Sequence, residues 1–331
     1  MTKLLVLEDK NVFERHAPDE LSRQCEITLL SQFTPEEEIL ARATDTEILL
    51  VNPTISVSGK LISELPHLRL VQTEGVGFEG VSLEAANKRG IYVCNCRGVN
   101  ARAVAEHTVM LMLCCLRDVI NGYQDVMEGR QNDKKVWYMK TGALRELGDC
   151  TVGFIGYGAI GKEAARLTRA FGARTLYYKP HPSDEEFAEY CELDELLKQC
   201  DIVSLNLPLT AETENMADAG FFSRMKKGAY LINTARGGLV NSRDLIEAIA
   251  CGQLTGAGLD VLDHEPVQRD HILVTAPEEI RRKIIFTPHI AGVSSAAFAR
   301  TYEVIMENIR RIQNGEKPIN IVNGPFITNP A

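Results

Sequence analysis

The chain has 331 residues, enough for two domains, and its apolar content of 45% is ordinary for a globular protein. A net charge of −9 and a pI near 5.4, without clustered lysines and arginines, argue against a nucleic-acid partner. The start becomes acidic at Glu8 and Asp9, too soon for a signal peptide, and the longest apolar run, residues 109–116, is too short to span a bilayer. We therefore expect a cytoplasmic protein without a membrane partner.

Nine cysteines are scattered along the chain, several of them inside apolar stretches. Free thiols pack as small hydrophobes, and an odd, scattered set fits a reducing compartment without a disulfide framework. The candidate metal ligands in this set are Cys94, Cys96 and His107. The one-residue spacing is not that of paired zinc ligands and no second pair follows, so no metal is expected.

The first hundred residues alternate short apolar runs with polar segments of helical spacing. The runs cover residues 4–7, 48–51, 68–72 and 91–93. This alternation predicts a small parallel sheet surrounded by helices. A long helix is then predicted over residues 101–121. It is apolar around much of its circumference, so it should be buried, either between domains or against another subunit.

A glycine-rich turn follows the next apolar run. Residues 152–155 read as a buried strand, Gly156, Gly158 and Gly161 follow, and residues 162–171 continue with helical spacing. In a dinucleotide site, the first glycine allows the tight turn, the second lets the backbone approach a pyrophosphate, and the third lets helix and strand pack closely. The phosphates would then lie on the amides of the helix N-terminus.

A second alternating set continues to the C-terminal region. Its strands are predicted near residues 151–155, 174–178, 202–205, 230–233, 257–260 and 284–286, with one intervening helix capped by Asn241 or Ser242. A last helix over residues 294–313 would return the chain to the first domain, where residues 318–322 would finish. The predicted fold is α/β with two doubly wound parallel-sheet domains. A substrate domain of residues 1–100 and 290–331 encloses a dinucleotide-binding Rossmann domain of residues 101–289, with the active site in the cleft between them.

Three residues follow strand-like runs in the second set: Arg236, Glu265 and His289. Open α/β sheets place functional groups at the ends of such strands. A guanidinium can clamp a carboxylate with two hydrogen bonds, and an imidazole held by a carboxylate can transfer a proton near neutral pH. Together they point to reduction of a 2-keto acid. We expect His264, the neighbouring histidine, to be a loop residue.

Along almost its whole length the chain resembles the NAD(P)-dependent D-2-hydroxyacid dehydrogenases. The resemblance is carried by Gly75-Val76-Gly77-Phe78, by Val104-Ala105-Glu106-His107, by the glycine turn and by the three catalytic segments. It implies reversible hydride transfer between NAD(P)H and C2 of a small 2-keto or D-2-hydroxy acid of the glyoxylate, hydroxypyruvate or pyruvate type. It also implies a flavodoxin-like substrate domain and a homodimer to which the long helix region contributes.

The resemblance assigns roles residue by residue. Arg236 would hold the substrate carboxylate and polarise the carbonyl, His289 would act as general acid in reduction, and Glu265 would fix its tautomer and raise its pKa. The substrate-binding residues implied are Gly75, Val76, Gly77, Arg236 and His289. The cofactor-binding residues implied are Val104, Gly156, Gly158, Ala159, Ile160, Gly161, Lys179, Leu207, Pro208, Thr234, Ala235, Arg236, Asp260 and His289. For Asp260, hydrogen bonding to its own loop is an alternative role.

Two positions depart from the family pattern. Lys179 stands where NAD-dependent members carry an aspartate, and an ammonium attracts the 2′-phosphate that a carboxylate repels, so the cofactor is NADP or NAD with NADP favoured. Arg97 stands where many relatives carry proline. It is either a surface charge or a group that reaches the cleft and favours a dianionic substrate.

Single residues distinguish this chain from family members with other functions. Formate-oxidising members replace the glutamate with glutamine, whereas Glu265 is present here, and phosphite-oxidising members carry a lysine where this chain has Val76. A nicotinamide-sensing, corepressor-like binding protein keeps the same trio. Only the lack of long docking extensions in this sequence favours the metabolic enzyme over it.

Overall fold

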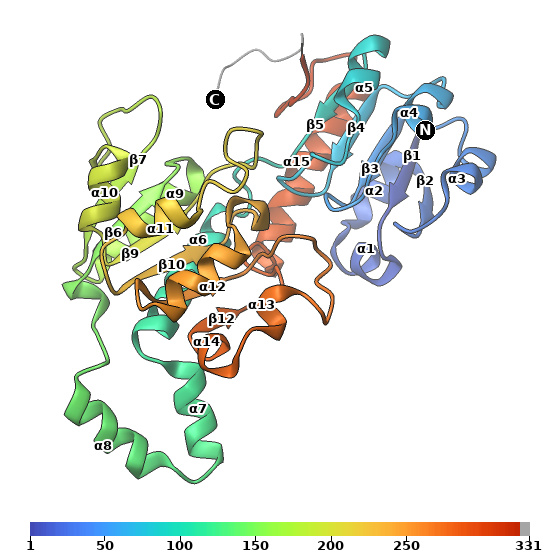
Figure 1. Ribbon diagram of the computed structural model, residues 1–331. Coiled ribbons are helices and arrows are strands. Elements are labelled where there is room, and N and C mark those ends of the chain that lie inside the picture. The colour runs from blue at the N-terminus through green and yellow to red at the C-terminus, as the bar shows by residue number, and fades with distance from the viewer. Residues whose placement is uncertain (325–331) are drawn as a thin grey trace. The chain divides into compact units, whose positions relative to one another are not determined.

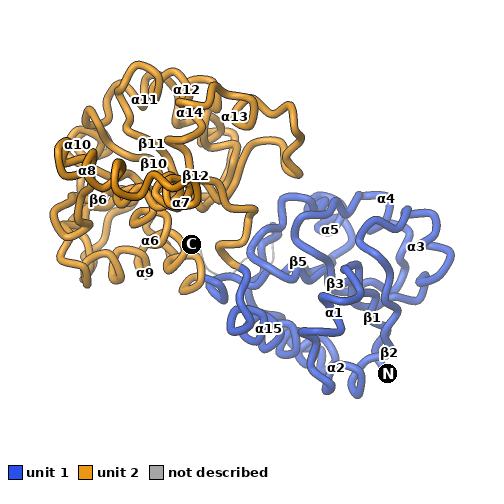
Figure 2. Tube along the Cα trace, turned by 90° about the horizontal axis from the view of Figure 1, so that it is seen from below, with its two compact units in different colours: residues 1–100, 293–331 blue, residues 101–292 orange. Residues whose placement is uncertain are grey.

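The computed structural model describes residues 1–324, and the chain forms two compact units. Unit 1 comprises residues 1–100 and 293–331, and unit 2 comprises residues 101–292 (Figure 2). Each unit contains one parallel sheet with helices on its faces (Figure 1), which confirms the predicted fold class. The returning segment of unit 1 starts at residue 293, three residues beyond the predicted start at residue 290. Residues 325–331 of the predicted substrate domain lie outside the described part.

Unit 1 has a five-stranded sheet in the order β2-β1-β3-β4-β5, in which every pairing is parallel. Its strands are β1 (Thr2–Leu7), β2 (Cys25–Leu30), β3 (Ile48–Val51), β4 (Leu70–Thr73) and β5 (Tyr92–Cys94). Its helices are α1 (Lys10–His16), α2 (Asp19–Gln24), α3 (Glu36–Arg42), α4 (Gly59–Glu64), α5 (Leu83–Arg89) and α15 (Ser295–Gln313).

The sheet of unit 1 is buried on both faces because its strands are apolar at successive positions. In β1, Leu5 and Leu7 pack with the layer that includes α3, α4 and α5, whereas Leu4 and Val6 pack with α15. Ser294 caps α15 by accepting from the amide of Ala297. After α15 the chain returns to β5, where Ile321 forms an antiparallel bridge with Cys94.

Unit 2 has a seven-stranded sheet in the order β12-β11-β10-β9-β6-β7-β8. Its strands are β6 (Thr151–Ile155), β7 (Arg174–Tyr178), β8 (Glu189–Tyr190), β9 (Ile202–Leu205), β10 (Ala229–Asn233), β11 (Leu254–Leu259) and β12 (Ile284–Phe286). Its helices are α6 (Ala101–Leu116), α7 (Val119–Met127), α8 (Gln131–Thr141), η1 (Leu147–Asp149), α9 (Ala159–Ala170), α10 (Leu193–Gln199), α11 (Ala219–Arg224), η2 (Gly237–Leu239), α12 (Ser242–Ala250), α13 (Ile272–Thr275) and α14 (Glu278–Arg281).

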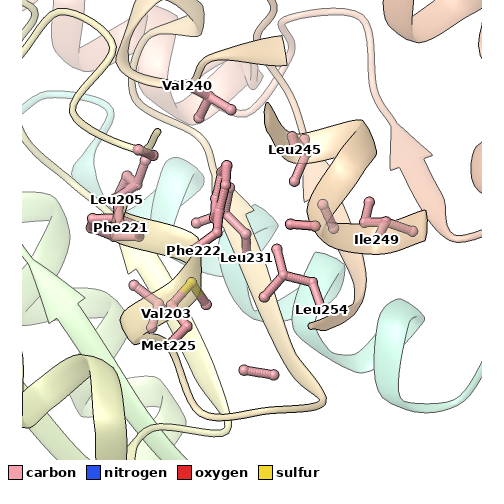
Figure 3. Packing of buried hydrophobic residues seen from close by; sticks show 14 of the residues in the cluster. Val203, Leu205, Phe221, Phe222, Met225, Leu231, Val240, Leu245, Ile249 and Leu254 are labelled. Atoms are coloured by element: carbon pink, nitrogen blue, oxygen red, sulfur yellow. The ribbon is translucent and has the colours of Figure 1, made fainter. Parts of the chain in front are cut away.

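Two apolar layers cover the faces of this sheet. Alternate residues of β10 divide between them, since Leu231 enters the layer of α10 to α14 while Tyr230 and Ile232 enter the layer of α6 and α9. Figure 3 shows residues of the first layer, in which Phe222 is drawn beside Leu231 and Phe221 beside Leu205. Removing either fully buried phenyl ring would cost about 3–5 kcal/mol. This core holds the strand ends in a fixed register.

The predicted long helix over residues 101–121 is wrong in its C-terminal part. The helix α6 ends at Leu116, and Asp118 adopts a left-handed conformation with φ of 49°. An α-helix cannot continue through that conformation. The apolar sides of α6 pack largely on the sheet and on α9 of its own unit. The helices α7 and α8 then extend away from the sheet of unit 2 (Figure 1).

The strand order reverses between β6 and β9, and ligands of open α/β sheets bind at such a switch point. The glycine turn follows β6, and Leu207 and Pro208 follow β9, so both segments flank this point. Within the described residues 1–324, no helix is both long and apolar enough to cross a membrane.

Candidate active site

The glycine turn after β6 has a separate steric reason for each glycine. Gly156 has φ of 86°, and a Cβ there would lie 2.4 Å from the carbonyl oxygen of Asn206. A Cβ at Gly161 would lie 2.6 Å from the carbonyl oxygen of Gly156. Gly158 faces open space, with nothing within 4 Å of such a Cβ. The first and third glycines therefore close the turn, and the second leaves its surface open.

The helix α9 begins at this turn without a side-chain cap. Gly158 is its N-cap residue, and Ala159 and Ile160 form its first turn. Unpaired amides at a helix N-terminus favour an anion. A hollow of about 340 Å³ beside the turn is lined in part by Tyr157, Ala159 and Lys162. The open backbone, the uncapped amides and the hollow fit the phosphate and ribose portion of a dinucleotide.

A hydrogen-bonded turn positions Arg236 at the end of β10. The side chain of Asn233 donates to the carbonyl of Arg236 at 2.8 Å and accepts from the amide of Ala235 at 3.0 Å. The guanidinium Nη1 of Arg236 donates to the carbonyl of Ala235 at 2.8 Å. This turn orients the arginine from a fully buried residue, Asn233.

Gly237 is needed for contact within the protein. A Cβ there would lie 1.9 Å from the carbonyl carbon of Leu262, so the segments after β10 and β11 touch through their backbones. A Cβ at Gly238 would approach Leu209 to 3.0 Å. The close packing brings the Arg236 segment against the segment that carries Glu265.

Glu265 and His289 form a direct pair. The Oε2 atom of Glu265 lies 2.5 Å from Nδ1 of His289, and its Oε1 atom accepts from the amide of Leu262 at 2.9 Å. The hydrogen bond that His289 donates to Glu265 raises the pKa of His289 against the opposing effects of burial and of Arg236. Burial alone would raise the pKa of Glu265, but hydrogen bonds from His289 and Leu262 outweigh it and lower that pKa. With Nδ1 engaged by the carboxylate, Nε2 is the nitrogen left for a reacting group.

Asp260 holds the His289 segment in place. Its buried carboxylate accepts from the amides of Ile290 and Ala291 at 3.0 and 2.8 Å and from the hydroxyl of Thr287 at 2.6 Å. The backbone carbonyl of Asp260 also accepts from the amide of His289 at 2.9 Å. Burial would raise the pKa of Asp260, but these bonds, together with His107, hold it well below its usual range. Asp260 thus bonds a loop, but it is the loop after β12 and not the one that follows Asp260 itself.

Two residues in this network were not assigned from the sequence. The Nε2 atom of His107 lies 2.9 Å from Oγ1 of Thr287 and 3.4 Å from Oδ1 of Asp260. His107 belongs to the quoted Val-Ala-Glu-His motif, and Thr287 precedes Pro288 in the catalytic histidine segment. Both positions were visible as motif residues, but their contact joins segments 180 residues apart. His264, by contrast, is an exposed loop residue.

The remaining cofactor candidates lie on several elements of unit 2. Val104 is buried on α6, and the hydroxyl of Thr234 lies 2.8 Å from that of Thr108 on the same helix. Leu207 is partly buried, and Pro208 is exposed. Lys179 directly follows β7, and its Nζ lies 2.9 Å from Oε1 of Glu185. The ammonium proposed to recognise a phosphate is thus already paired with a carboxylate.

The predicted substrate loop, residues 75–77, belongs to unit 1. The carbonyl of Gly75 accepts from the amide of Cys96 at 2.7 Å, and the carbonyl of Val76 accepts from the side chain of Asn95 at the same distance. The amides of residues 75–77 have no acceptor among the described residues. Successive unpaired amides are suited to an anion. Arg97 is exposed, and Cys94 and Cys96 are buried free thiols.

Reduction of a keto acid by a nicotinamide requires a dinucleotide site and a proton donor beside a cation. In unit 2, a glycine turn that fits a dinucleotide follows one parallel strand, and the His289–Glu265 pair and Arg236 follow others. This is the architecture of a nicotinamide-dependent dehydrogenase.

Comparisons with known proteins indicate the same class of enzyme. Residues 109–291, more than half of the chain, match the family "D-isomer specific 2-hydroxyacid dehydrogenase, NAD binding domain". The chain is 34% identical over 298 residues to a glyoxylate reductase of Pyrococcus furiosus, covering 88% of this chain and 87% of the relative. It is 31% identical over 303 residues to a hydroxypyruvate reductase of Thermotoga maritima, covering 89% and 94%.

A similar solved structure is the NAD-complexed D-isomer specific 2-hydroxyacid dehydrogenase of Lactobacillus delbrueckii ssp. bulgaricus. It has a TM-score of 0.81 and 27% identity, and the match covers 97% of this chain and 100% of that one. The chain therefore belongs to the D-isomer-specific 2-hydroxyacid dehydrogenase family. The predicted family and enzyme class are confirmed, and use of NAD(P) is supported.

Proposed function

We propose that this enzyme reduces a small 2-keto acid, of the glyoxylate, hydroxypyruvate or pyruvate type, to the D-2-hydroxy acid. The observation that carries the proposal is the His289–Glu265 pair at 2.5 Å, with Arg236 close enough to oppose protonation of the imidazole. The similarity to a glyoxylate reductase and a hydroxypyruvate reductase supports the size of the substrate.

His289 transfers the proton in this function. Because Glu265 engages Nδ1, the Nε2 atom donates to the carbonyl oxygen in reduction and accepts a proton from the hydroxyl in oxidation. The raised pKa of His289 keeps the donor protonated toward neutral pH. When bound, a reduced nicotinamide supplies the hydride that adds to C2.

Two groups bind the substrate carboxylate in this proposal. Arg236 offers a planar guanidinium that also polarises the C2 carbonyl. The loop of Gly75, Val76 and Gly77 offers backbone amides that lack acceptors among residues 1–324. Fixing the carboxylate at C1 orients the adjacent carbonyl for proton transfer.

The cofactor lies along the glycine turn in this proposal. Gly156, Gly158 and Gly161, with Ala159 and Ile160, hold the pyrophosphate. Lys179 contacts the adenosine ribose end, and the segment Leu207–Pro208, the pair Thr234–Ala235, Val104, Arg236, Asp260 and His289 border the nicotinamide end. The ammonium of Lys179 favours NADPH over NADH.

The alternative is a binding protein that senses nicotinamide without turnover, and the similarity to a glyoxylate reductase and a hydroxypyruvate reductase favours the enzyme over it. The described residues show no feature that separates it from the enzyme, since it would keep Arg236, Glu265 and His289. Multiple turnovers of a keto acid at a rate above background distinguish the enzyme from the sensor.

The partner we propose is a second copy of this chain, through the projecting helices α7 and α8. These helices expose large apolar side chains, including Tyr123 at 65%, Met127 at 69% and Met139 at 76%. Exposed apolar patches of this kind mark interaction sites. Light scattering should give twice the mass of one chain, and the double variant Met127→Glu, Met139→Glu should shift the measured mass toward that of one chain.

The free thiols suit a reducing compartment, which supports a cytoplasmic location.

The experiment that tests the function is a panel of 2-keto acids assayed with NADPH and NADH. The enzyme should reduce at least one small member, and His289→Ala should lower turnover by ~10²–10⁴ while cofactor binding persists. Failure of every small keto acid, or near-normal turnover by His289→Ala, would overturn the proposal.

A further inference from the structure

A compact charge cluster lies on the connection between β7 and β8. The Nζ atom of Lys179 lies 2.9 Å from Oε1 of Glu185, and the Nζ atom of Lys162 lies 2.9 Å from Oε2. The hydroxyl of Ser183 lies 2.7 Å from Oε1 of the same carboxylate. Each oxygen of Glu185 therefore has its own ammonium partner, and one also has a hydroxyl.

The side chain of Glu185 is only 9% exposed. Asp125 and Asp201 are also shielded carboxylates with two cationic partners each, but neither borders the glycine turn. Burial alone would raise the pKa of Glu185, but bonds from Lys162, Lys179 and Ser183 lower it to about 2. The two lysines and Glu185 together carry one excess positive charge, and the lysine side chains are 49% and 22% exposed, so an anion can reach them. Glu163 and Glu186 also line the hollow, and Glu163 is paired with Arg166. Two converging ammonium groups favour an anion with more than one negative charge.

The cluster borders the glycine turn. Lys162 is in the first turn of α9, and it lines the hollow beside the turn together with Glu185 and Tyr157. The hydroxyl of Tyr157 is buried and has no hydrogen-bonding partner within residues 1–324. Lys179 directly follows β7, the second strand of the dinucleotide fold, where the ribose 2′ position of such cofactors is recognised.

We propose that Lys162, Lys179 and Ser183 form the binding site for the 2′-phosphate of NADP(H), and that Glu185 occupies this anion site until the phosphate displaces it. The inference rests on the dinucleotide site of the proposed function. A phosphate monoester carries a charge of about −1.5 to −2 and three acceptor oxygens, so it can replace every contact of the carboxylate. NADH has no group that needs this site.

The anion site stays assembled when Glu185 leaves it. The amide of Ser183 donates to the hydroxyl of Tyr177 at 3.2 Å, and that hydroxyl also donates to the carbonyl of Ser183. At the other end of the segment, the hydroxyl of Thr175 donates to the carbonyl of Phe187. Only residues 184–186 lie between these two anchors, so displacement of Glu185 requires movement of three residues.

Displacement makes Glu185 a competitor of the phosphate. Neutralising its charge removes the competitor and leaves both lysines in place, so affinity for a 2′-phosphate should rise. Removing Lys162 takes away one cation and should lower that affinity. A carboxylate that instead bound the ribose hydroxyls of NADH would behave differently, because its loss would weaken nucleotides without a 2′-phosphate.

The test measures binding of adenosine 2′,5′-bisphosphate and of 5′-AMP to the full chain by calorimetry, without a keto acid. Glu185→Gln should bind the bisphosphate about tenfold more tightly and 5′-AMP within about twofold of the unmodified protein. Lys162→Met should bind the bisphosphate at least about tenfold more weakly. Asp184→Asn, an exposed neighbour with the same change of charge, should leave both affinities unchanged.

The outcomes separate this inference from the proposed function. An unchanged or weakened bisphosphate affinity in Glu185→Gln would overturn the displacement, and a loss of 5′-AMP affinity would assign Glu185 to the ribose. If neither nucleotide binds the unmodified protein or competes with NADH, the dinucleotide site itself is wrong and both proposals fail. Thermal unfolding of each variant checks that a loss of binding is not a loss of fold.

Discussion

The Nδ1 atom of His289 lies 2.5 Å from Oε2 of Glu265, and the same carboxylate accepts from the amide of Leu262. The pair therefore has a fixed tautomer, with Glu265 held by its own loop and His289 held by the backbone of Asp260. Proton transfer at Nε2 of His289 therefore depends on the carboxylate charge of Glu265 at Nδ1.

Replacing Glu265 by glutamine should lower the pH range in which the enzyme reduces keto acids. The hydrogen bond and charge of Glu265 raise the pKa of His289, so glutamine would let the imidazole lose its proton at lower pH. Reduction needs the protonated form, and the alkaline limb of the kcat profile should move to lower pH. An unchanged alkaline limb would separate His289 from Glu265 in catalysis.

Replacing Arg236 by lysine should impair substrate use although the charge is kept. A lysine cannot reproduce two parallel hydrogen bonds to a carboxylate, and the loss of one charged bond costs about 1.5–3 kcal/mol. The measurement is kcat/KM for the preferred keto acid, which should fall by at least about tenfold. Arg243→Lys, an exposed arginine on α12, is the matched control. Equal kcat/KM in all three proteins would remove Arg236 from the site.

Replacing Lys179 by aspartate should shift the cofactor preference toward NADH. The change removes an attraction for the 2′-phosphate and adds a repulsion, and a second carboxylate would stand beside Glu185. The expected shift is at least ~1–3 kcal/mol in the ratio of catalytic efficiencies for NADPH and NADH. Lys227→Asp, an exposed lysine of the same unit, should leave the ratio alone. A strong preference of the unmodified enzyme for NADH would contradict the assignment of Lys179.

Replacing Glu74 by glutamine should stabilise the protein above neutral pH. Both carboxyl oxygens of Glu74 are buried without a hydrogen-bonding partner among the described residues, and the charged or titratable groups that face it are Glu8, Tyr302 and Cys96. Burial raises the pKa of Glu74 to about 7, from 4.5 in water. A raised carboxyl pKa contributes stability that is complete below pH 4.5 and is lost as the pH rises through about 7.

The shift corresponds to at most about 3 kcal/mol of unfolding free energy at alkaline pH. Thermal unfolding at pH ~5 should differ little between the unmodified protein and Glu74→Gln, whereas at pH ~8.5 the variant should unfold at the higher temperature. Glu64→Gln, an exposed carboxyl in the same unit, serves as the control. The same difference at both pH values would mean that Glu74 does not titrate in this range.

Much of the fold followed from local sequence pattern. The strands at residues 48–51, 151–155, 174–178, 202–205 and 284–286 match the structure at both ends, because a buried parallel strand is a short, nearly continuous apolar run. The edge strands β2 and β8 were missed. Glu26 and Thr28 interrupt the first, and the second is only two exposed residues long. The other two edge strands, β5 and β12, are short apolar runs and were predicted, so the polar interruption and the short length hid β2 and β8.

The sequence alone also selected the candidate site residues, since Arg236, Glu265 and His289 were chosen by residue type and motif. Tertiary structure decided their arrangement. Three contacts join separate segments: the close approach of Gly237 to Leu262, the hydrogen bonds of Asp260 with residues 289–291, and the ion pair of Lys179 with Glu185. Such contacts depend on strand register, on the path of loops and on which charges share one buried space. Residue type sets what a group can do, and only packing sets which partner it meets.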